Sequence, residues 1–213
     1  MISNAVQRST IARAIGSEID KLVLERLSGL VEEPDITSRI GQRLEDRFDG
    51  RRLGGHKVRV ITETIPSHGA KSLEKPTGAD LYIAIGVQPR QGPQVTKGVL
   101  VQAKRRDRIT HDWRGLSEQC RRMCKITKKG SVVWTYGGRG VGAMRADQVV
   151  VGTEAPVLSL EEMFDAILQC QIGDKRRVPA GEFGDRVALA KMIREFGTRN
   201  AIWLELEAGR SGT

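Results

Sequence analysis

The stretch ADLYIAIGVQPRQGPQVTKGVLVQAK, residues 79–104, contains two apolar runs separated by a connection with two prolines and a glycine. This composition predicts strands over residues 79–87 and 98–104, joined as an antiparallel hairpin. With the turn at the middle of the connection, residues that face each other across the hairpin have numbers that sum to about 182 to 184. Asp80 is therefore expected opposite Gln102 to Lys104.

Side chains alternate between the two faces of a strand, so Gln102 and Lys104 are expected to point the same way. An acid, an amide and an ammonium group then meet at one end of the sheet. Mg²⁺ prefers hard oxygen ligands, which the Asp80 carboxylate, the Gln102 side-chain carbonyl and the Ala103 backbone carbonyl would supply. Lys104 would hold an attacking water or offset the charge that builds on a phosphate. The alternative interpretation is a salt bridge between Asp80 and Lys104 at the end of the sheet.

The whole sequence predicts an α/β domain with a mixed sheet, and we expect one domain over residues 1–213. Apolar residues at steps of three and four indicate the helices, and β-branched or alternating runs indicate the strands. A serine followed three positions later by a glutamate predicts a capping box near residue 159. The other expected elements are a helix within 1–33, a helix from after Asp35 or Thr37 to about Gly50, a strand over 56–65, a loop to Gly78, a helix over 112–125, strands over 131–137 and 140–146, and helices within 158–173 and 182–196.

The charge of the chain is concentrated in one segment. The 35 Lys and Arg residues exceed the 26 Asp and Glu residues, which gives a net charge of +9, and residues 104–129 contain ten cations and three acids. Clustered cations are what a phosphate-binding surface needs, because each neutralised phosphate releases counterions. A solvated charged surface without a ligand is the alternative interpretation. The candidate nucleic-acid-binding residues here are Arg105, Arg106, Arg108, Arg114, Arg121, Arg122 and Lys125.

The segments TGADLYIAIG and GVLVQAK together resemble the core of the PD-(D/E)xK nucleases, the restriction-endonuclease-like superfamily. In that family an acid at the start of one strand is followed on the next strand by (D/E)xK. Asp80 matches the first acid, Gln102 the position of the second acid, and Lys104 the lysine.

The order of the predicted elements over residues 36–150 is also similar to the α-β-β-β-α-β core of that family. The resemblance therefore implies a restriction-endonuclease-like core over this range. Residues 1–35 and 151–213 would then be N-terminal and C-terminal helical extensions.

The resemblance implies a catalytic site that binds Mg²⁺ or Mn²⁺. Gln102 departs from the acidic consensus and is similar to the glutamine of the Mrr-like branch, which implies weaker metal binding or a single metal ion. The family often adds an acid from the first core helix, and Glu45 is the matching candidate, with Glu63 and Glu74 as rivals. Gln119, on the helix after the motif, would contact the DNA backbone or the site; the alternative is an exposed helix residue.

The resemblance and the charge together predict a metal-dependent endonuclease that cuts double-stranded DNA, of a restriction or antiviral defence type. The alternatives are a non-catalytic DNA-binding module, alone or as a subunit of a larger complex, and a nuclease for branched DNA or RNA. A homodimer and a subunit of a defence complex are both left open. The sequence has no apolar run of about 18 residues and no apolar signal segment, so we expect a cytoplasmic protein without membrane contact.

Overall fold

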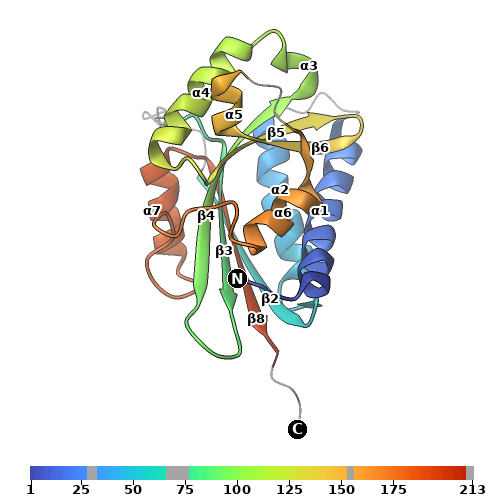
Figure 1. Ribbon diagram of the computed structural model, residues 1–213, viewed down its shortest axis with the longest axis vertical. Coiled ribbons are helices and arrows are strands. Elements are labelled where there is room, and N and C mark those ends of the chain that lie inside the picture. Colours follow the sequence, from blue (N-terminus) through green and yellow to red (C-terminus); the bar gives the residue numbers. More distant parts are fainter. Residues whose placement is uncertain (28–32, 66–76, 153–155, 210–213) are drawn as a thin grey trace.

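The computed structural model describes residues 1–27, 33–65, 77–152 and 156–209. These residues form one mixed eight-stranded sheet with helices on both faces (Figure 1), which confirms the predicted α/β fold. The elements along the chain are α1 (Ala5–Leu27), α2 (Glu33–Phe48), β1 (Arg52–Leu53), β2 (His56–Thr64), β3 (Leu81–Gln88), β4 (Val95–Arg105), α3 (Arg106–Ile109), α4 (Trp113–Ile126), β5 (Ser131–Gly137), β6 (Gly140–Arg145), α5 (Ala146–Val151), β7 (Leu158–Ser159), α6 (Leu160–Leu168), α7 (Arg186–Phe196) and β8 (Asn200–Ala208). The strands lie in the order β1-β2-β8-β3-β4-β5-β6-β7.

The hairpin at the centre of the chain has the predicted register. β3 and β4 are antiparallel, and Leu81 lies opposite Val101, a pair whose numbers sum to 182. β4 then runs parallel to β5, with Lys104 opposite Thr135, and β5 and β6 form the second predicted hairpin. The short helix α3, directly after β4, was not predicted. The start of β3 and the end of β4 therefore meet at one end of the sheet.

The prediction that residues 151–213 form a purely helical extension is wrong. This segment contains α6 and α7, as expected, but also β8, which pairs antiparallel with β2 and parallel with β3. Residues 201–206 are all buried, because the strand lies inside the sheet and both of its faces are covered. β2 and β3 are consequently not neighbours. Residues 36–150 alone do not form a continuous sheet, because β8 lies between these two strands.

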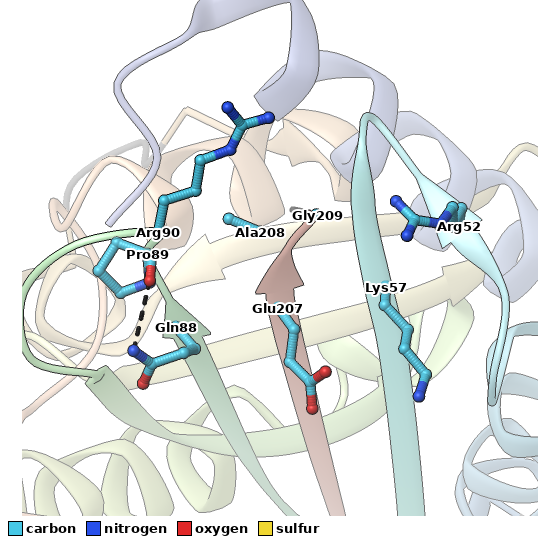
Figure 2. A pocket seen from close by; sticks show the side chains of 8 residues that line it. All are labelled: Arg52, Lys57, Gln88, Pro89, Arg90, Glu207, Ala208 and Gly209. Atoms are coloured by element: carbon cyan, nitrogen blue, oxygen red, sulfur yellow. Dashed lines mark hydrogen bonds between the residues drawn. The ribbon is translucent and has the colours of Figure 1, made fainter. Parts of the chain in front are cut away.

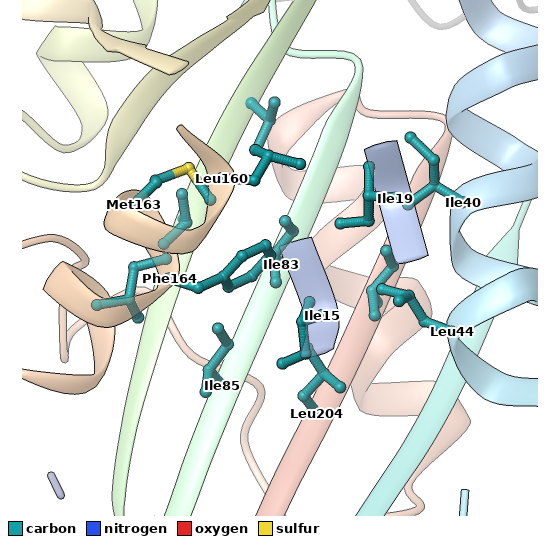
Figure 3. Close-up of a cluster of buried hydrophobic side chains, with 14 of the residues drawn as sticks. Ile15, Ile19, Ile40, Leu44, Ile83, Ile85, Leu160, Met163, Phe164 and Leu204 are labelled. Atoms are coloured by element: carbon teal, nitrogen blue, oxygen red, sulfur yellow. The ribbon is translucent and has the colours of Figure 1, made fainter. Parts of the chain in front are cut away.

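Two apolar layers cover the sheet. α1, α2 and α6 pack on one face, where Ile15, Ile40 and Phe164 meet Ile83 and Leu204 of the strands (Figure 3). The predicted N-terminal helix is thus part of the main core. α4 and α7 pack on the opposite face over a second cluster, which includes Tyr82, Leu100, Met123, Phe196 and Trp203. Burial of each such side chain contributes about 1.5–3 kcal/mol, so both layers fix the position of the strand ends.

The predicted capping box is present at the start of α6. The Ser159 hydroxyl accepts from the backbone N–H of Glu162, and the Glu162 carboxylate accepts from the backbone N–H of Ser159. These bonds hold the pKa of Glu162 below its usual range, because they favour the charged form.

No helix in the described part of the chain is long and apolar enough to cross a membrane. The three cysteines are free thiols, and Cys120 is buried in the small apolar cluster between α4 and β5.

Candidate metal and nucleic-acid site

Asp80, Gln102 and Ala103 come together where β3 begins and β4 ends. The Asp80 backbone N–H donates to the carbonyl of Val101 at 2.8 Å, which extends the hairpin by one residue. One carboxylate oxygen of Asp80, Oδ2, accepts from Gln102 Nε2 at 2.5 Å and from the Ala103 N–H at 3.0 Å. Gln102 Nε2 also donates to the Ala103 carbonyl at 2.9 Å. The structure therefore brings three of the four predicted metal ligands, Asp80, Gln102 and Ala103, together.

The orientation of the Gln102 amide bears on whether this cluster fits a cation. Gln102 is only 3% exposed, and its Oε1 atom has no hydrogen-bond partner among the described residues. A buried acceptor without a partner costs about 1–3 kcal/mol. Nε2 lies between the Asp80 carboxylate and the Ala103 carbonyl, where a cation would also be attracted. Rotation of the amide by half a turn would bring Oε1 to that position, beside the two other oxygens.

With the amide in the rotated orientation, one carboxylate and two neutral oxygens from the chain would fit a hard cation such as Mg²⁺ or Mn²⁺. Within the described residues, no group of three or more His, Cys, Asp or Glu side chains could hold a metal ion. A cation at Asp80 would therefore depend on water or phosphate oxygens to complete its shell.

Lys104 lies on the same face of β4 as Gln102, but its ion-pair partner is not Asp80. Its Nζ donates to Asp112 Oδ2 at 2.7 Å, so the alternative interpretation of a salt bridge between Asp80 and Lys104 is wrong. Asp112 directly precedes α4, and Gly115 leaves room for it, because a Cβ on Gly115 would lie 2.3 Å from Asp112 Oδ1. The Asp112 side chain is half exposed, whereas the Lys104 side chain is mostly buried.

Glu45, the first candidate for a further ligand, serves a different purpose in the structure. Its Oε2 accepts from the backbone N–H of Thr62 at 3.1 Å and from the Thr62 hydroxyl. Asp49, directly after the end of α2, accepts from the N–H of Val60 at 2.9 Å. Both N–H groups point away from β8, along the open edge of β2. Glu45 and Asp49 thus satisfy the donors of a strand edge that would otherwise invite pairing with another chain.

Glu63, one of the two rival acids, is not at Asp80 either. It forms an ion pair of 3.4 Å with Arg186, which also lies 3.5 Å from Glu45. β8 separates β2 from β3, so Glu63 lies roughly 10 Å across the sheet from the strand that follows Asp80. Glu74 lies outside the described residues.

The predicted cations lie on three elements: α4, the end of β4, and α3. Arg114, Arg121 and Lys125 are exposed along one stripe of α4, and Arg121 also pairs with Glu118 at 3.2 Å. Arg122 is half-buried. The remaining cations belong to the end of β4 and to α3, where Arg105 pairs with Asp107 at 3.0 Å and Arg106 and Arg108 are exposed. Arg105 and Arg106 also line a cavity of about 480 Å³ beside Tyr136.

Gln119, on α4, packs against the chain just before Asp80. Gly78, two residues before Asp80, has a φ of +76°, and a Cβ there would lie 2.9 Å from the Cβ of Gln119. Only glycine permits both this backbone conformation and this approach. Gln119 Oε1 is a buried acceptor with no partner in the described part of the chain. Two amide oxygens without partners are therefore found on residues packed around the chain at Gly78 to Asp80.

A cavity of about 890 Å³ lies at the other end of the sheet (Figure 2). Gln88 ends β3 there, so roughly 26 Å of strand separates this cavity from Asp80. Arg52, Lys57 and Arg90 line it, but Figure 2 shows them pointing in different directions around Glu207. Sequence reasoning did not identify this cavity, and its diverging cations make no common binding point.

No known protein family, no curated protein and no solved structure matches the chain.

Proposed function

We propose that the chain is a divalent-cation-dependent nuclease that hydrolyses phosphodiester bonds in duplex DNA. The observation that carries this proposal is the position of Gln102 Nε2, which lies 2.5 Å from Asp80 Oδ2 and 2.9 Å from the Ala103 carbonyl, with Lys104 on the same face of the strand. A group of oxygens around one point, with an ammonium beside it, is the arrangement that phosphoryl chemistry requires.

In this proposal each residue has a defined task. Asp80, the rotated Gln102 amide and the Ala103 carbonyl would hold the cation, and a bound cation would supply Lewis-acid chemistry at the phosphate and at an attacking water. Lys104 exchanges Asp112 for the phosphate and offsets the negative charge that develops on it. The exposed cations of α4 position the duplex through its backbone and carry no sequence information.

The second candidate is a DNA-binding module that does not cut. It is favoured by one feature: the Gln102 amide already bonds both the Asp80 carboxylate and the Ala103 carbonyl, so the cluster is satisfied on that side without a cation. Under this alternative, DNA binding would show a steep salt dependence, and calorimetry would detect no divalent-ion binding.

The test is cleavage of plasmid DNA in Mg²⁺ or Mn²⁺ by the wild type and by Asp80→Asn. Asparagine is chosen because alanine would leave two buried donors without an acceptor and would damage the fold. Glu207→Gln, the same acid-to-amide change at the far end of the sheet, is the matched control. We expect cleavage by the wild type and by the control but not by Asp80→Asn.

Equal cleavage by Asp80→Asn and the wild type would refute the assignment of Asp80. Absence of cleavage by the wild type, together with tight DNA binding, would favour the binding module. Linear duplex, branched DNA and RNA substrates compared side by side then distinguish a duplex endonuclease from a junction or RNA nuclease.

A further inference from the structure

A second group of cations surrounds a cavity of about 540 Å³ beside β4, away from the Asp80 cluster. In the part of the chain that the structure describes, its lining contains five cations and one carboxylate. The lining residues are Lys97, Lys128, Lys129, Gly173, Asp174, Lys175 and Arg176. Only Lys128 and Lys129 belong to the basic segment that the sequence singled out, so the fold assembles this site from distant parts of the chain.

The backbone around this cavity is firmly held. β5 begins to pair with β4 at Leu100, and below that point residues 173–177 cross the free edge of β4. Gly98 and Asp174 exchange two backbone hydrogen bonds of 3.0 Å, and the Gly173 N–H donates to the Lys129 carbonyl at 2.9 Å. Gly98 is needed for this crossing, because a Cβ there would lie 1.7 Å from the carbonyl oxygen of Arg177. The cations are therefore presented by a fixed frame.

The charges in the cavity are largely uncompensated. Lys97 is only 7% exposed, and its Nζ donates to the Gly173 carbonyl at 3.3 Å, which is a neutral partner. The single carboxylate, Asp174, is engaged by Arg176 at 2.9 Å. Lys128 and Lys175 are exposed. Crowding of like charges costs stability unless an anion lies among them, so this arrangement favours a bound anion.

A row of cations connects this cavity to the Asp80 cluster. Arg114, Arg121 and Lys125 lie along the exposed stripe of α4, which starts beside Lys104 and ends two residues before Lys128. α4 has 14 residues and is therefore about 21 Å long. Since phosphates along one strand of DNA are spaced by about 3.4 Å of helix axis, this length corresponds to about six base pairs.

We propose that the cavity is a second phosphate-binding site, which holds the backbone of the same duplex about six base pairs from the Asp80 cluster. The inference rests on the proposed binding of duplex DNA but not on its cleavage. It implies that the protein needs a duplex long enough to reach from Lys104 to Lys128, and that Lys97, Lys128 and Lys175 act on affinity without taking part in the reaction.

The experiment measures the affinity for a hairpin-capped duplex of about 20 base pairs over a range of salt concentrations. Lys128→Ala/Lys175→Ala removes two cations of the cavity, and both side chains are exposed, so folding is not at risk. Arg52→Ala/Lys57→Ala is the matched control, because it removes two cations that line the far cavity. Thermal unfolding checks that both variants are folded.

The expected result follows from counterion release. Loss of two phosphate contacts makes the negative slope of log Kobs against log salt less steep by about 1.8. Between about 50 and 200 mM salt, the variant should therefore lose about twelvefold less affinity than the wild type loses. The control should keep the slope of the wild type. In a duplex of about five base pairs, too short to reach from Lys104 to Lys128, the difference between wild type and Lys128→Ala/Lys175→Ala should shrink.

An unchanged slope in Lys128→Ala/Lys175→Ala would overturn the inference, and so would an equal decrease in the control, which would indicate diffuse charge instead of a site. These outcomes leave the proposed nuclease intact if the wild type cuts and Asp80→Asn does not. Conversely, duplex binding with the expected slopes but without cleavage would support the second phosphate site and refute the nuclease.

Discussion

Replacement of Gln102 by glutamate is the most direct perturbation of the candidate site. In the structure the amide nitrogen donates to Asp80 Oδ2 at 2.5 Å and to the Ala103 carbonyl at 2.9 Å. Gln102→Glu puts an acceptor oxygen where this donor was, with almost no change in shape. The two attractive contacts of the amide nitrogen become repulsive contacts between oxygens. The new carboxylate also lies beside the Asp80 carboxylate in a buried site.

The size of the effect can be worked from these contacts. A net hydrogen bond contributes about 0.5–1.5 kcal/mol, and one to a charged group about 1.5–3 kcal/mol, so the loss of both costs about 2–4 kcal/mol. A protein of this length changes its Tm by about 2–4 °C for each kcal/mol. Without a divalent ion, the Tm of Gln102→Glu should fall by about 10 °C. Mg²⁺ should reverse this loss, because a second carboxylate is a better ligand than an amide.

The assay is thermal unfolding of the wild type, Gln102→Glu and Gln102→Ala, each in EDTA and in Mg²⁺. Gln102→Ala loses the same donor without adding charge, so its Tm should fall in both buffers. The deficit of Gln102→Glu in EDTA should also shrink as the pH is lowered, because adjacent carboxyl groups then share a proton. A Gln102→Glu variant as stable as the wild type in EDTA would refute the placement of the Gln102 amide between two oxygens, and a variant whose Tm does not respond to Mg²⁺ would refute the metal site.

Three further predictions concern other parts of the molecule. Glu45→Ala should lower the free energy of unfolding in urea by about 1 kcal/mol, because the edge N–H of Thr62 loses its acceptor, while DNA cleavage per folded molecule stays at the wild-type level. Burial raises the pKa of Glu205, so the wild type loses stability as the pH rises through that pKa. Near pH 7, Glu205→Gln should therefore unfold at a higher urea concentration than the wild type. In acid, where Glu205 is protonated, this difference should vanish. Gly98→Ala should lower the free energy of unfolding by about 3 kcal/mol or more, because its Cβ would collide with the carbonyl of Arg177; an unchanged urea midpoint would contradict the close crossing at that residue.

The parts of the fold that sequence predicted well are those fixed by neighbours along the chain. The register of β3 and β4 followed from the length of their connection, and the cap of α6 followed from Ser159 and Glu162 alone. β8 was missed because its place depends on β2 and β3, which lie more than a hundred residues earlier. Nothing local in residues 200–208 indicates that this strand separates two others.

The same distinction applies to the candidate site. Asp80, Gln102 and Ala103 were placed correctly relative to one another because the hairpin joins them. Glu45 was assigned from its place on the first core helix, but the side chain turns to the edge of β2, a contact that depends on which strand is left at the edge of the sheet. Asp112 was not identified as the partner of Lys104, since the connection through α3 that brings them together was not predicted.

A site with one carboxylate sets a condition on how the proposed nuclease would work. Lys104 and the exposed cations of α4 lie on the same face of the sheet as Asp80, and they would repel a divalent ion in the absence of DNA. Bound DNA cancels that positive charge and adds phosphate oxygens to the shell, so the affinity for metal should rise once the duplex is in place. The coupling is reciprocal, and the metal must strengthen DNA binding by the same factor. The Gln102 amide fits this scheme, because it satisfies Asp80 and the Ala103 carbonyl until both ligands arrive together.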